Sequence, residues 1–410
     1  MQHRIVVLGA GYTGAVAAGR LARRLHRADV TITLVNPEPD FVERVRLHQL
    51  AVGQDLKPRP LSEMFAGTGV ELKLAKVTAV DVDRRTVTVT GANGPEREDL
   101  AYDTLVYALG SGWNDGGVPG AVTHAYEVSS RPGALRLRDR LAALGAGRPV
   151  VVVGGGLTGL EAATEIAEAR PDLDVALATH GALGDWLSEK GRAHLRKVAD
   201  QLGITVHEYA AVDAVEADRV TTADGRTIPA EVTVWTTGFA VHPIAQATAL
   251  ELADRGQIVV DATMRSVSHP DVYAVGDAAM AIGPNDKPLR MSCASGVPMA
   301  WQAADAIAAR LAGVKVPRVP IRYFQQCVSL GRTEGLIQFV TADDQAKDGA
   351  LTGRLAALYK ELICKGAAWG VAHPTLGMPS RRRRVVRTPG SAAAAAPASA
   401  ATAAAPTTAA

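Results

Sequence analysis

The pattern of apolar positions at the start of the chain predicts a strand, a glycine-rich turn, a helix and a second strand. Residues 4–8 (RIVVL) and 30–35 (VTITLV) are short apolar runs rich in β-branched side chains, which is typical of buried strands. Between them, residues 9–14 are glycine-rich, and residues 15–27 are rich in Ala, Leu and Arg, which favour a helix. A unit this short predicts a right-handed βαβ crossover and therefore a parallel sheet.

The same pattern returns about 145 residues later. Residues 149–153 are predicted to form a strand, residues 154–159 a turn, residues 160–169 a helix and residues 173–178 a second strand. This duplication predicts an α/β fold with two nucleotide-binding modules.

Shorter alternating runs next to turn residues predict hairpins carried on these modules. Residues 86–90 (TVTVT) precede the turn at 91–94, and residues 219–222 precede the turn at 223–225. Residues 323–337 are predicted to contain a further strand that begins a small third domain.

Residues 351–365 place apolar side chains at helical spacing, with most charged side chains on the opposite face. We expect this helix to pack its apolar face on its own domain. The alternative is peripheral membrane contact through residues 351–387, because the arginines at 381–384 would attract anionic lipid. Residues 379–410, basic at first and then rich in Ala, Pro and Thr, are predicted to be a disordered tail with a solvated charge run. The apolar positions of the helix are Leu351, Leu355, Leu358, Tyr359, Leu362 and Ile363, and the charged ones are Arg354, Lys360, Glu361 and Lys365.

Composition and charge exclude several classes of function. The 410 residues predict two or three domains, and a net charge of +2 argues against nucleic acid as the main partner. No run of about 18 apolar residues occurs, and Gly9 interrupts the apolar run at the N-terminus, so neither a spanning helix nor a secretory signal is expected. We therefore expect a cytoplasmic protein, with peripheral attachment to the inner face of the cytoplasmic membrane as the alternative.

The chain has three cysteines, Cys293, Cys327 and Cys364, which are widely spaced. They form no CxxC or Cys/His pattern, so neither a disulfide framework nor a metal site is expected. Cys293 is interpreted as a small apolar residue, the commoner fate of a buried free cysteine, with a redox role as the alternative.

The first glycine-rich turn carries the motif GxGxxG between a predicted strand and a predicted helix. Its first glycine permits the tight turn, its second lets a pyrophosphate approach the backbone, and its third allows close packing of the helix. The free N–H groups of the helix N-terminus would bind the phosphates. The predicted nucleotide contacts in this turn are Gly9, Gly11, Tyr12, Thr13 and Gly14.

The end of the second strand departs from the usual pattern of such sites. Asn36 stands where an acidic residue would accept hydrogen bonds from the adenosine ribose. The Asn36 amide can still bond a hydroxyl without the charge-assisted contact. Glu38 and Asp40 are close enough in sequence to substitute, or they are solvated loop residues.

The second glycine-rich turn repeats the motif in the second module. The strand after it ends in Ala178, Thr179 and His180 without a carboxylate, so the choice between NADH and NADPH stays open. The predicted nucleotide contacts are Gly154, Gly156, Leu157, Thr158 and Gly159.

Three further segments carry a resemblance to a known superfamily. Residues 102–111 (YDTLVYALGS) and 231–238 each form a strand followed by a small-residue turn, and residues 268–278 (SHPDVYAVGDA) end in Gly-Asp. With both glycine-rich turns, these segments resemble the two-dinucleotide-binding flavoproteins of the pyridine nucleotide-disulfide oxidoreductase superfamily. The resemblance implies bound FAD and NAD(P)H, with further contacts at Val77, Ala108, Gly110, Gly238, Gly276 and Asp277.

Within this superfamily the chain most resembles type II NADH dehydrogenases and the apoptosis-inducing-factor-like ferroptosis suppressors, over about residues 4–378. The resemblance implies two Rossmann-like domains of the glutathione-reductase type and a small C-terminal region. The implied parts are a discontinuous FAD domain (1–118 and 258–312), an NAD(P)H domain (119–257) and a capping or membrane-contact region (313–378).

Two features of the family are missing from this chain. Residues 36–75 contain no cysteine pair, so a redox disulfide beside the flavin is not expected, and residues 291–302 (MSCASGVPMAWQ) lack the glutamine-rich quinone motif. A helix is still predicted to start near residues 296–299 with its positive end towards the flavin. Glu161 is the candidate catalytic residue, for nicotinamide placement or proton traffic; its alternative is a carboxylate stabilised by the helix dipole.

The resemblance implies hydride transfer from NAD(P)H to the flavin and electron transfer onward to a quinone or a similar small acceptor. One alternative is a soluble reductase for a ferredoxin- or rubredoxin-type protein. Another is a redox-sensing protein that holds both nucleotides with negligible turnover. The sequence leaves the acceptor and the oligomeric state open.

Overall fold

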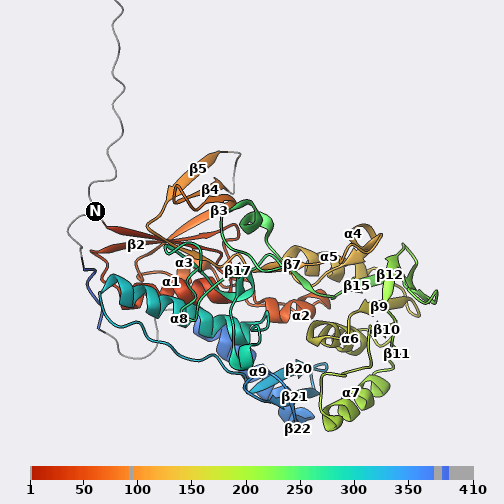
Figure 1. Ribbon diagram of the computed structural model, residues 1–410. Helices are drawn as coiled ribbons and strands as arrows, with labels where there is room; N and C mark the ends of the chain where they lie inside the picture. Colours follow the sequence, from red (N-terminus) through yellow and green to blue (C-terminus); the bar gives the residue numbers. More distant parts are fainter. Residues whose placement is uncertain (1, 92–93, 95, 374–380, 387–410) are drawn as a thin grey trace, which may run out of the picture.

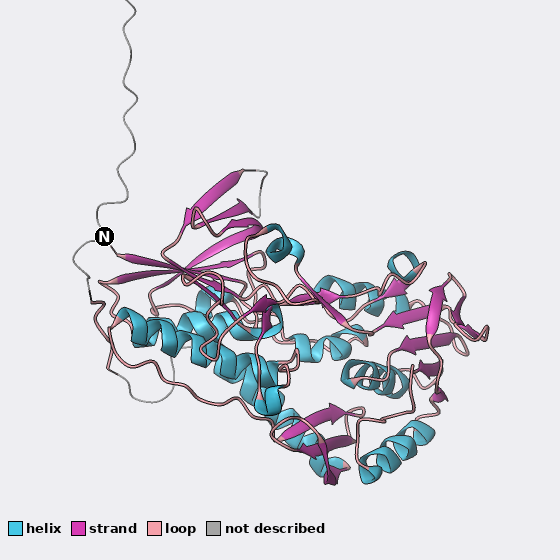
Figure 2. Ribbon diagram, in the orientation of Figure 1, coloured by secondary structure: helices cyan, strands magenta, loops and turns pink. Residues whose placement is uncertain are grey.

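The computed structural model describes residues 2–91, 94, 96–373 and 381–386. Two main sheets, each with helices around it, make up most of the molecule, and a small sheet with the helix α9 lies beside them (Figure 1). Helices and strands alternate through both main parts (Figure 2), so the predicted α/β class is confirmed.

The first main sheet has seven strands in the order β18-β6-β1-β2-β3-β4-β5. The strands β18, β6, β1, β2 and β3 run parallel, and β3, β4 and β5 form an antiparallel meander that includes the predicted hairpin. Helix α1 (Tyr12–Arg24) connects β1 to β2, and α8 (Cys293–Leu311) packs against α1. The strands are β1 (His3–Leu8), β2 (Val30–Asn36), β3 (Val70–Asp81), β4 (Thr86–Gly91), β5 (Arg97–Ala101), β6 (Thr104–Tyr107) and β18 (Val272–Ala274).

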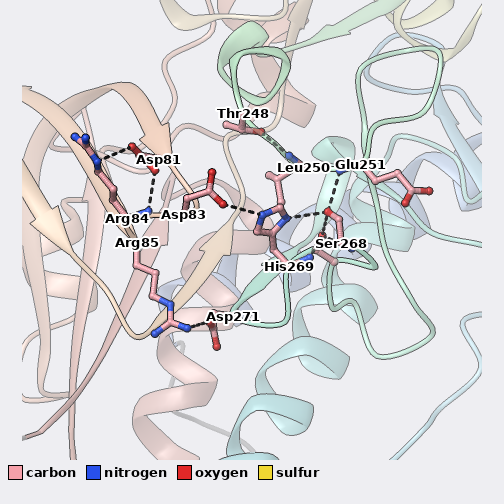
Figure 3. A network of polar contacts seen from close by, with 11 residues as sticks. Asp81, Asp83, Arg84, Arg85, Thr248, Leu250, Glu251, Ser268, His269 and Asp271 are labelled. Atoms are coloured by element: carbon pink, nitrogen blue, oxygen red, sulfur yellow. Dashed lines mark hydrogen bonds and ion pairs between the residues drawn. The ribbon is translucent and has the colours of Figure 1, made fainter. Parts of the chain in front are cut away.

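Strand β18 joins this sheet from far along the chain, and a polar network holds the returning segment against the β3–β4 turn (Figure 3). Arg85 Nη2 lies 2.6 Å from Asp271 Oδ2. The His269 ring lies 3.7 Å from Asp83 Oδ1 and 3.0 Å from Ser268 Oγ. The part of the molecule that contains the first glycine-rich turn is therefore completed by residues more than 250 positions away.

The second main sheet is parallel, in the order β11-β10-β9-β15-β8. Helix α6 (Leu157–Ala169) connects β9 to β10, which confirms the repeated βαβ unit, and the second predicted hairpin is β13–β14. The other elements here are β8 (Ala125–Tyr126), β9 (Pro149–Val153), β10 (Asp174–Ala178), β11 (Thr205–His207), β12 (Val212–Val215), β13 (Arg219–Thr222), β14 (Thr227–Pro229), β15 (Val232–Trp235), α5 (Arg131–Ala142) and α7 (Glu189–Gln201).

Short elements connect these parts. They are η1 (Arg44–Arg46), α2 (Leu47–Ala51), α3 (Leu61–Met64), β7 (Ser111–Trp113), α4 (Ala121–His124), β16 (Phe239–Val241), η2 (Pro243–Ala247), β17 (Ile258–Val259), η3 (Gly276–Ala278), β19 (Ala279–Met280) and η4 (Pro284–Asp286). Strands β7 and β16 pair with each other, so the chain segments that follow β6 and β15 lie side by side.

The C-terminal region is a three-stranded antiparallel sheet followed by a long helix. The single strand predicted at 323–337 is in fact two strands, β20 (Gln325–Ser329) and β21 (Gly335–Val340), which pair with each other and with β22 (Ala346–Thr352). Helix α9 (Arg354–Ala372) follows and packs on this sheet and on α1.

Helix α9 exposes the apolar face that was predicted to be buried, while Arg354 and Lys365 of the predicted polar face also stay exposed. Leu355, Leu358 and Leu362 of the apolar face are 69%, 58% and 60% exposed, while Lys360 of the polar face points inward. The inward face carries small residues such as Ala356, and the backbone there lies so close to β21 that a side chain at Gly335 would clash with it. Close backbone packing, and the ion pair of Lys360 described below, therefore decide which face is buried.

Residues 381–386 belong to the predicted tail, but they make backbone contacts with the first main part. Arg383 N donates to Arg24 O at 2.8 Å, and Val386 N donates to Leu311 O at 2.9 Å, at the C-terminal ends of α1 and α8. The basic run is therefore bound along this surface where the structure describes it, in contrast to the solvated run that was expected. Residues 379–380 and 387–410 of the predicted tail lie outside the described residues. Within the described ranges, no helix is long and apolar enough to cross a bilayer.

Candidate functional site

The first glycine-rich turn has the geometry that a bound pyrophosphate needs. Gly9 has φ +91°, and a Cβ there would lie 2.5 Å from Ala108 O; a Cβ at Gly14 would overlap Gly9 O. In contrast, the space beside Gly11 is open, with no atom within 4 Å of a Cβ built there, and no side chain caps α1. The N–H groups at the start of α1 can therefore bind an anion, which fits the phosphates of FAD.

The second turn repeats this geometry at the start of α6. Gly154 has φ +124°, a Cβ at Gly159 would overlap Gly154 O, and the space beside Gly156 is open. Both helices begin earlier than predicted, α1 at Tyr12 and α6 at Leu157, because the third glycine of each motif lies inside the first helical turn.

Three elements meet at the N-terminus of α1. A Cβ at Gly276, in the turn after β18, would lie 2.9 Å from the Thr13 side chain, and one at Gly296 of α8 would lie 2.6 Å from Thr13 Cγ2. Ser111 Oγ, just after the turn that contains Gly110, donates to Asp277 Oδ2 at 2.6 Å. The helix predicted near residue 296 therefore exists, beginning at Cys293, and its N-terminus lies beside the predicted FAD residues.

The remaining predicted nucleotide residues lie around these turns. Asn36 Oδ1, at the end of β2, accepts a hydrogen bond from Ala10 N at 2.9 Å, so this amide fixes the turn itself. Val77 is buried in β3, and Gly238 directly precedes β16. Their contacts with nucleotides, like those of the other residues in the two turns, stay predictions.

Comparisons with known proteins agree with this geometry. The family model for pyridine nucleotide-disulphide oxidoreductases matches residues 3–308. The chain belongs to this family. It is 31% identical to the NADH dehydrogenase-like protein Rv1812c of Mycobacterium tuberculosis, over 72% of this chain and 78% of that protein. It is 27% identical to the demethylphylloquinone reductase NdbB of Synechocystis, over 67% of this chain and 72% of that protein.

Solved structures show the same fold at lower identity. The structure of NDH2 from Plasmodium falciparum in complex with NADH has a TM-score of 0.76 at 14% identity and covers 92% of this chain and 97% of that one. The sulfide:quinone oxidoreductase of Aquifex aeolicus has a TM-score of 0.74 at 21% identity, with 91% and 92% covered. The expected two-module flavoprotein fold and the use of FAD and a nicotinamide nucleotide are thereby confirmed, and the chain is an NADH-dependent flavin oxidoreductase.

A buried ion pair joins the second module to the C-terminal region. Glu161, in the second turn of α6, lies with Oε1 3.0 Å from Lys360 Nζ of α9 and accepts a hydrogen bond from Ser329 N of β20 at 3.1 Å. Lys360 Nζ also donates to Cys327 O at 3.1 Å. The candidate catalytic residue Glu161 is thus held by a lysine that the helical pattern had placed on the outer face of α9.

Both members of this pair are charged at neutral pH. Burial alone would lower the Lys360 pKa, but the Glu161 carboxylate raises it above its ordinary value. Burial alone would raise the Glu161 pKa, but Lys360 and the neighbouring His48 lower it below the ordinary value. An ion pair removed from water in this way is strongly coupled, so losing either partner leaves a buried charge uncompensated.

His48 completes the polar group, and no sequence motif indicated it. Its ring, 5% exposed on α2, has Nδ1 3.9 Å from Glu161 Oε2, and its Nε2 has no hydrogen-bond partner among the described residues. Burial lowers the His48 pKa to about 4, so the imidazole is neutral at pH 7. A neutral imidazole can donate from one nitrogen and accept at the other.

Of these groups, His48, Ser329 and Lys360 line a cavity of about 270 Å³ between α9, α2 and the β20–β21 turn. The lining is mixed. Its polar and charged residues also include Thr333, Arg332, Arg354 and Glu361, and its apolar residues include Val45, Ala357, Leu358 and Cys364. The arrangement suits a small flat molecule with an apolar ring and polar oxygen atoms.

The three cysteines, far apart in sequence, lie near this group as free thiols. Cys293 is exposed at the start of α8, in contrast to the buried residue that was expected. At Cys327 and Cys364 the Lys360 charge acts to lower the pKa, but burial is the larger effect and raises the pKa of Cys327 to about 11. Protonated thiols of this kind are poor nucleophiles. In the described parts of the chain, no group of three or more His, Cys, Asp or Glu side chains is arranged to hold a metal ion.

Proposed function

We propose that this protein transfers hydride from NAD(P)H to FAD and passes the electrons to a quinone in the cavity beside Lys360, without a redox disulfide. The observation that carries the proposal is the charged Glu161–Lys360 pair at a cavity that also has apolar lining residues. Relatives named as a demethylphylloquinone reductase and as type II NADH:quinone oxidoreductases support it.

Each group at the cavity has a chemical task under this proposal. FAD, when bound, accepts the hydride and releases electrons one or two at a time. The Lys360 ammonium donates to a quinone oxygen, where negative charge develops during reduction, and the Glu161 carboxylate keeps that ammonium charged. Leu358 and Cys364, which line the cavity, would contact the ring.

Rapid mixing without oxygen tests the proposal. NADH or NADPH should bleach the flavin absorbance, and menaquinone or ubiquinone analogues should restore it faster than ferredoxin does. Lys360→Met should slow the return of the flavin absorbance about 100-fold, which is a typical effect of losing a proton donor, and should leave the bleaching unchanged. Lys365→Met, an exposed lysine on the same helix, is the matched control. Restoration by ferredoxin alone would support a protein acceptor, and no turnover with any acceptor would support a sensor.

We also propose that the outward face of α9 binds a membrane surface. Its exposed side chains Leu355, Leu362 and Trp369 share one helix face with Leu358, which also lines the cavity, so an apolar acceptor could enter from the lipid. Flotation with anionic liposomes should recover the wild type and lose the double variant Leu355→Ser/Leu362→Ser. Equal flotation of both would exclude membrane binding by this face.

The domain boundaries at residues 118, 257 and 312 are likewise part of the proposal.

A further inference from the structure

A second carboxyl group lies one helical turn behind Glu161 on α6. Glu165 is 1% exposed, its Oε1 accepts a hydrogen bond from Gln54 Nε2, and its Oε2 has no hydrogen-bond partner among the described residues. A buried carboxylate oxygen without a donor is costly, so the site favours the protonated acid. Burial raises the pKa of Glu165 to about 7, although Arg332 and Gln54 act to lower it.

The two carboxyl groups are therefore neighbours whose pKa values are shifted in opposite directions. Side chains four residues apart on a helix lie next to each other, with Cβ atoms about 5–6 Å apart. Glu161 is a carboxylate held by Lys360, and Glu165 is poised to hold a proton at neutral pH. Paired groups whose surroundings push their pKa values apart are typical of proton-transfer sites.

The surroundings of the pair give it an inner side and an outer side. On the inner side, Lys360 and His48 lie between Glu161 and the cavity. On the outer side, Gln54 is half-buried in the loop after α2. The charged groups that act on Glu165 are Arg332 of the β20–β21 turn and Glu161 and Glu168 of α6, while Lys360, Arg332 and Arg46 act on His48.

Proton balance requires a route of this kind if the acceptor is a quinone. Oxidation of NADH supplies two electrons and one hydrogen, and a quinol needs two electrons and two protons. The overall reaction is NADH + H⁺ + quinone → NAD⁺ + quinol, so one proton per turnover must reach the cavity from solvent. Lys360 can give that proton once but must then regain it.

We propose that Glu165 is the relay residue that returns this proton. The Lys360 ammonium gives one proton to the quinone oxygen and becomes a neutral amine. The O–H bond of Glu165 then breaks as the Glu161 carboxylate takes its proton. Glu161 passes that proton to Lys360 Nζ, which forms the ammonium again. The Glu165 carboxylate regains a proton from solvent on the Gln54 side, so the protein ends each cycle unchanged. This inference rests on the proposed quinone reduction.

The first test is the pH profile of flavin reoxidation by a menaquinone analogue in the FAD-loaded enzyme. In the wild type the rate should fall as pH rises through about 7, where Glu165 loses its proton. Glu165→Gln should slow reoxidation at least tenfold at pH 6.5 and abolish that fall, with bleaching by NADH unchanged. Gln54→Leu removes a hydrogen bond that lowers the pKa of Glu165. The pKa should therefore rise in this variant, and the fall in rate should move to higher pH. Glu189→Gln, an exposed carboxyl at the start of α7, is the matched control.

A second readout is independent of turnover. Infrared titration of the enzyme without quinone should show a protonated-carboxyl band that disappears near pH 7, is missing in Glu165→Gln and persists in Glu189→Gln. An unchanged band or an unchanged pH profile in Glu165→Gln would overturn the relay alone. A wild type that reduces no quinone, while this band titrates as expected, would overturn the proposed function and the relay's role in it.

Discussion

The helices α1 and α6 begin with the same glycine geometry but differ one turn later. Val16 and Arg20 of α1 occupy the positions that Glu161 and Glu165 occupy in α6. Val16 is buried in the apolar core, and Arg20 pairs with Asp305 of α8 at 2.7 Å. The shared start of the unit suits any dinucleotide, so the chemistry that separates the two modules lies in the second and third helical turns.

The largest effect should come from removing the charge at the first of these positions. Glu161→Leu leaves the buried Lys360 ammonium without its carboxylate, which should lower the free energy of unfolding by about 3–5 kcal/mol. The matched change in α1, Val16→Ala, removes only about two methylene groups from the core and should cost about 1–2 kcal/mol. Urea unfolding of both variants measures the difference, and equal losses would contradict the pairing described for Lys360.

Glu165, at the second of these positions, should make the free energy of unfolding depend on pH between about 4.5 and 7. The pKa of Glu165 is about 7 in the folded protein and near 4.5 in the unfolded chain, so between these values only the folded state holds the proton. Its contribution to stability is therefore present at low pH and is lost as pH rises to 7. Buried His48 acts in the opposite direction between pH 4 and 6.5, since its pKa is lowered.

The wild type and Glu165→Gln must therefore be compared with each other at two pH values. From pH 5 to pH 8, the free energy of unfolding of the variant should rise by roughly 3 kcal/mol relative to that of the wild type, because a shift of one pKa unit corresponds to about 1.4 kcal/mol. Urea midpoints at the two pH values measure this gain. The same difference at both pH values would mean that Glu165 is already ionised at pH 5.

Substitution of the third glycine of each turn should impair the binding of one cofactor at a time, with a smaller effect on the free energy of unfolding. A Cβ at Gly14 or at Gly159 overlaps a backbone oxygen of its own turn, and overpacking of this kind costs about 1–3 kcal/mol. Gly14→Ala should weaken FAD retention on gel filtration, while Gly159→Ala should keep FAD and raise the NADH concentration needed for half-maximal bleaching. Loss of FAD in both variants would contradict the assignment of one cofactor to each turn.

Local signals account for what the sequence predicted well. Each βαβ unit needs only apolar runs, glycine spacing and a helix-forming segment within about 30 residues, so strands β1, β2, β9 and β10 appear almost where they were predicted. Glu161 could be predicted for the same reason, because it lies two residues after a motif. Glu165 lies four residues after Glu161 and therefore on the same helix face, which was a usable signal that was overlooked.

The cavity was not predictable, because its residues meet only in the folded chain. Helical periodicity identified α9 as amphipathic, but it could not tell that Gly335 lets the backbone approach and that Glu161 draws Lys360 inward. His48 belongs to a short helix without any motif, and its partners lie more than 100 residues away. Which face of a helix is buried depends on the surface it meets, and that surface is set by tertiary contacts.

The ends of the two helices give the smallest predicted difference. Both helices are capped by their own next residue, since Arg170 N donates to Ile166 O and Leu25 N donates to Leu21 O. Residues 381–386 add contacts at the end of α1, where Arg383 N donates to Arg24 O and Arg384 Nε lies 3.0 Å from Asp29 Oδ2. Arg384 is 66% exposed, and exposed pairs contribute about 0–1 kcal/mol. Arg384→Ala should therefore lower the urea midpoint only slightly, and 1 M salt should remove most of the difference from the wild type. A loss that persists in salt would show that the backbone contacts of this segment, rather than its charge, hold it against α1.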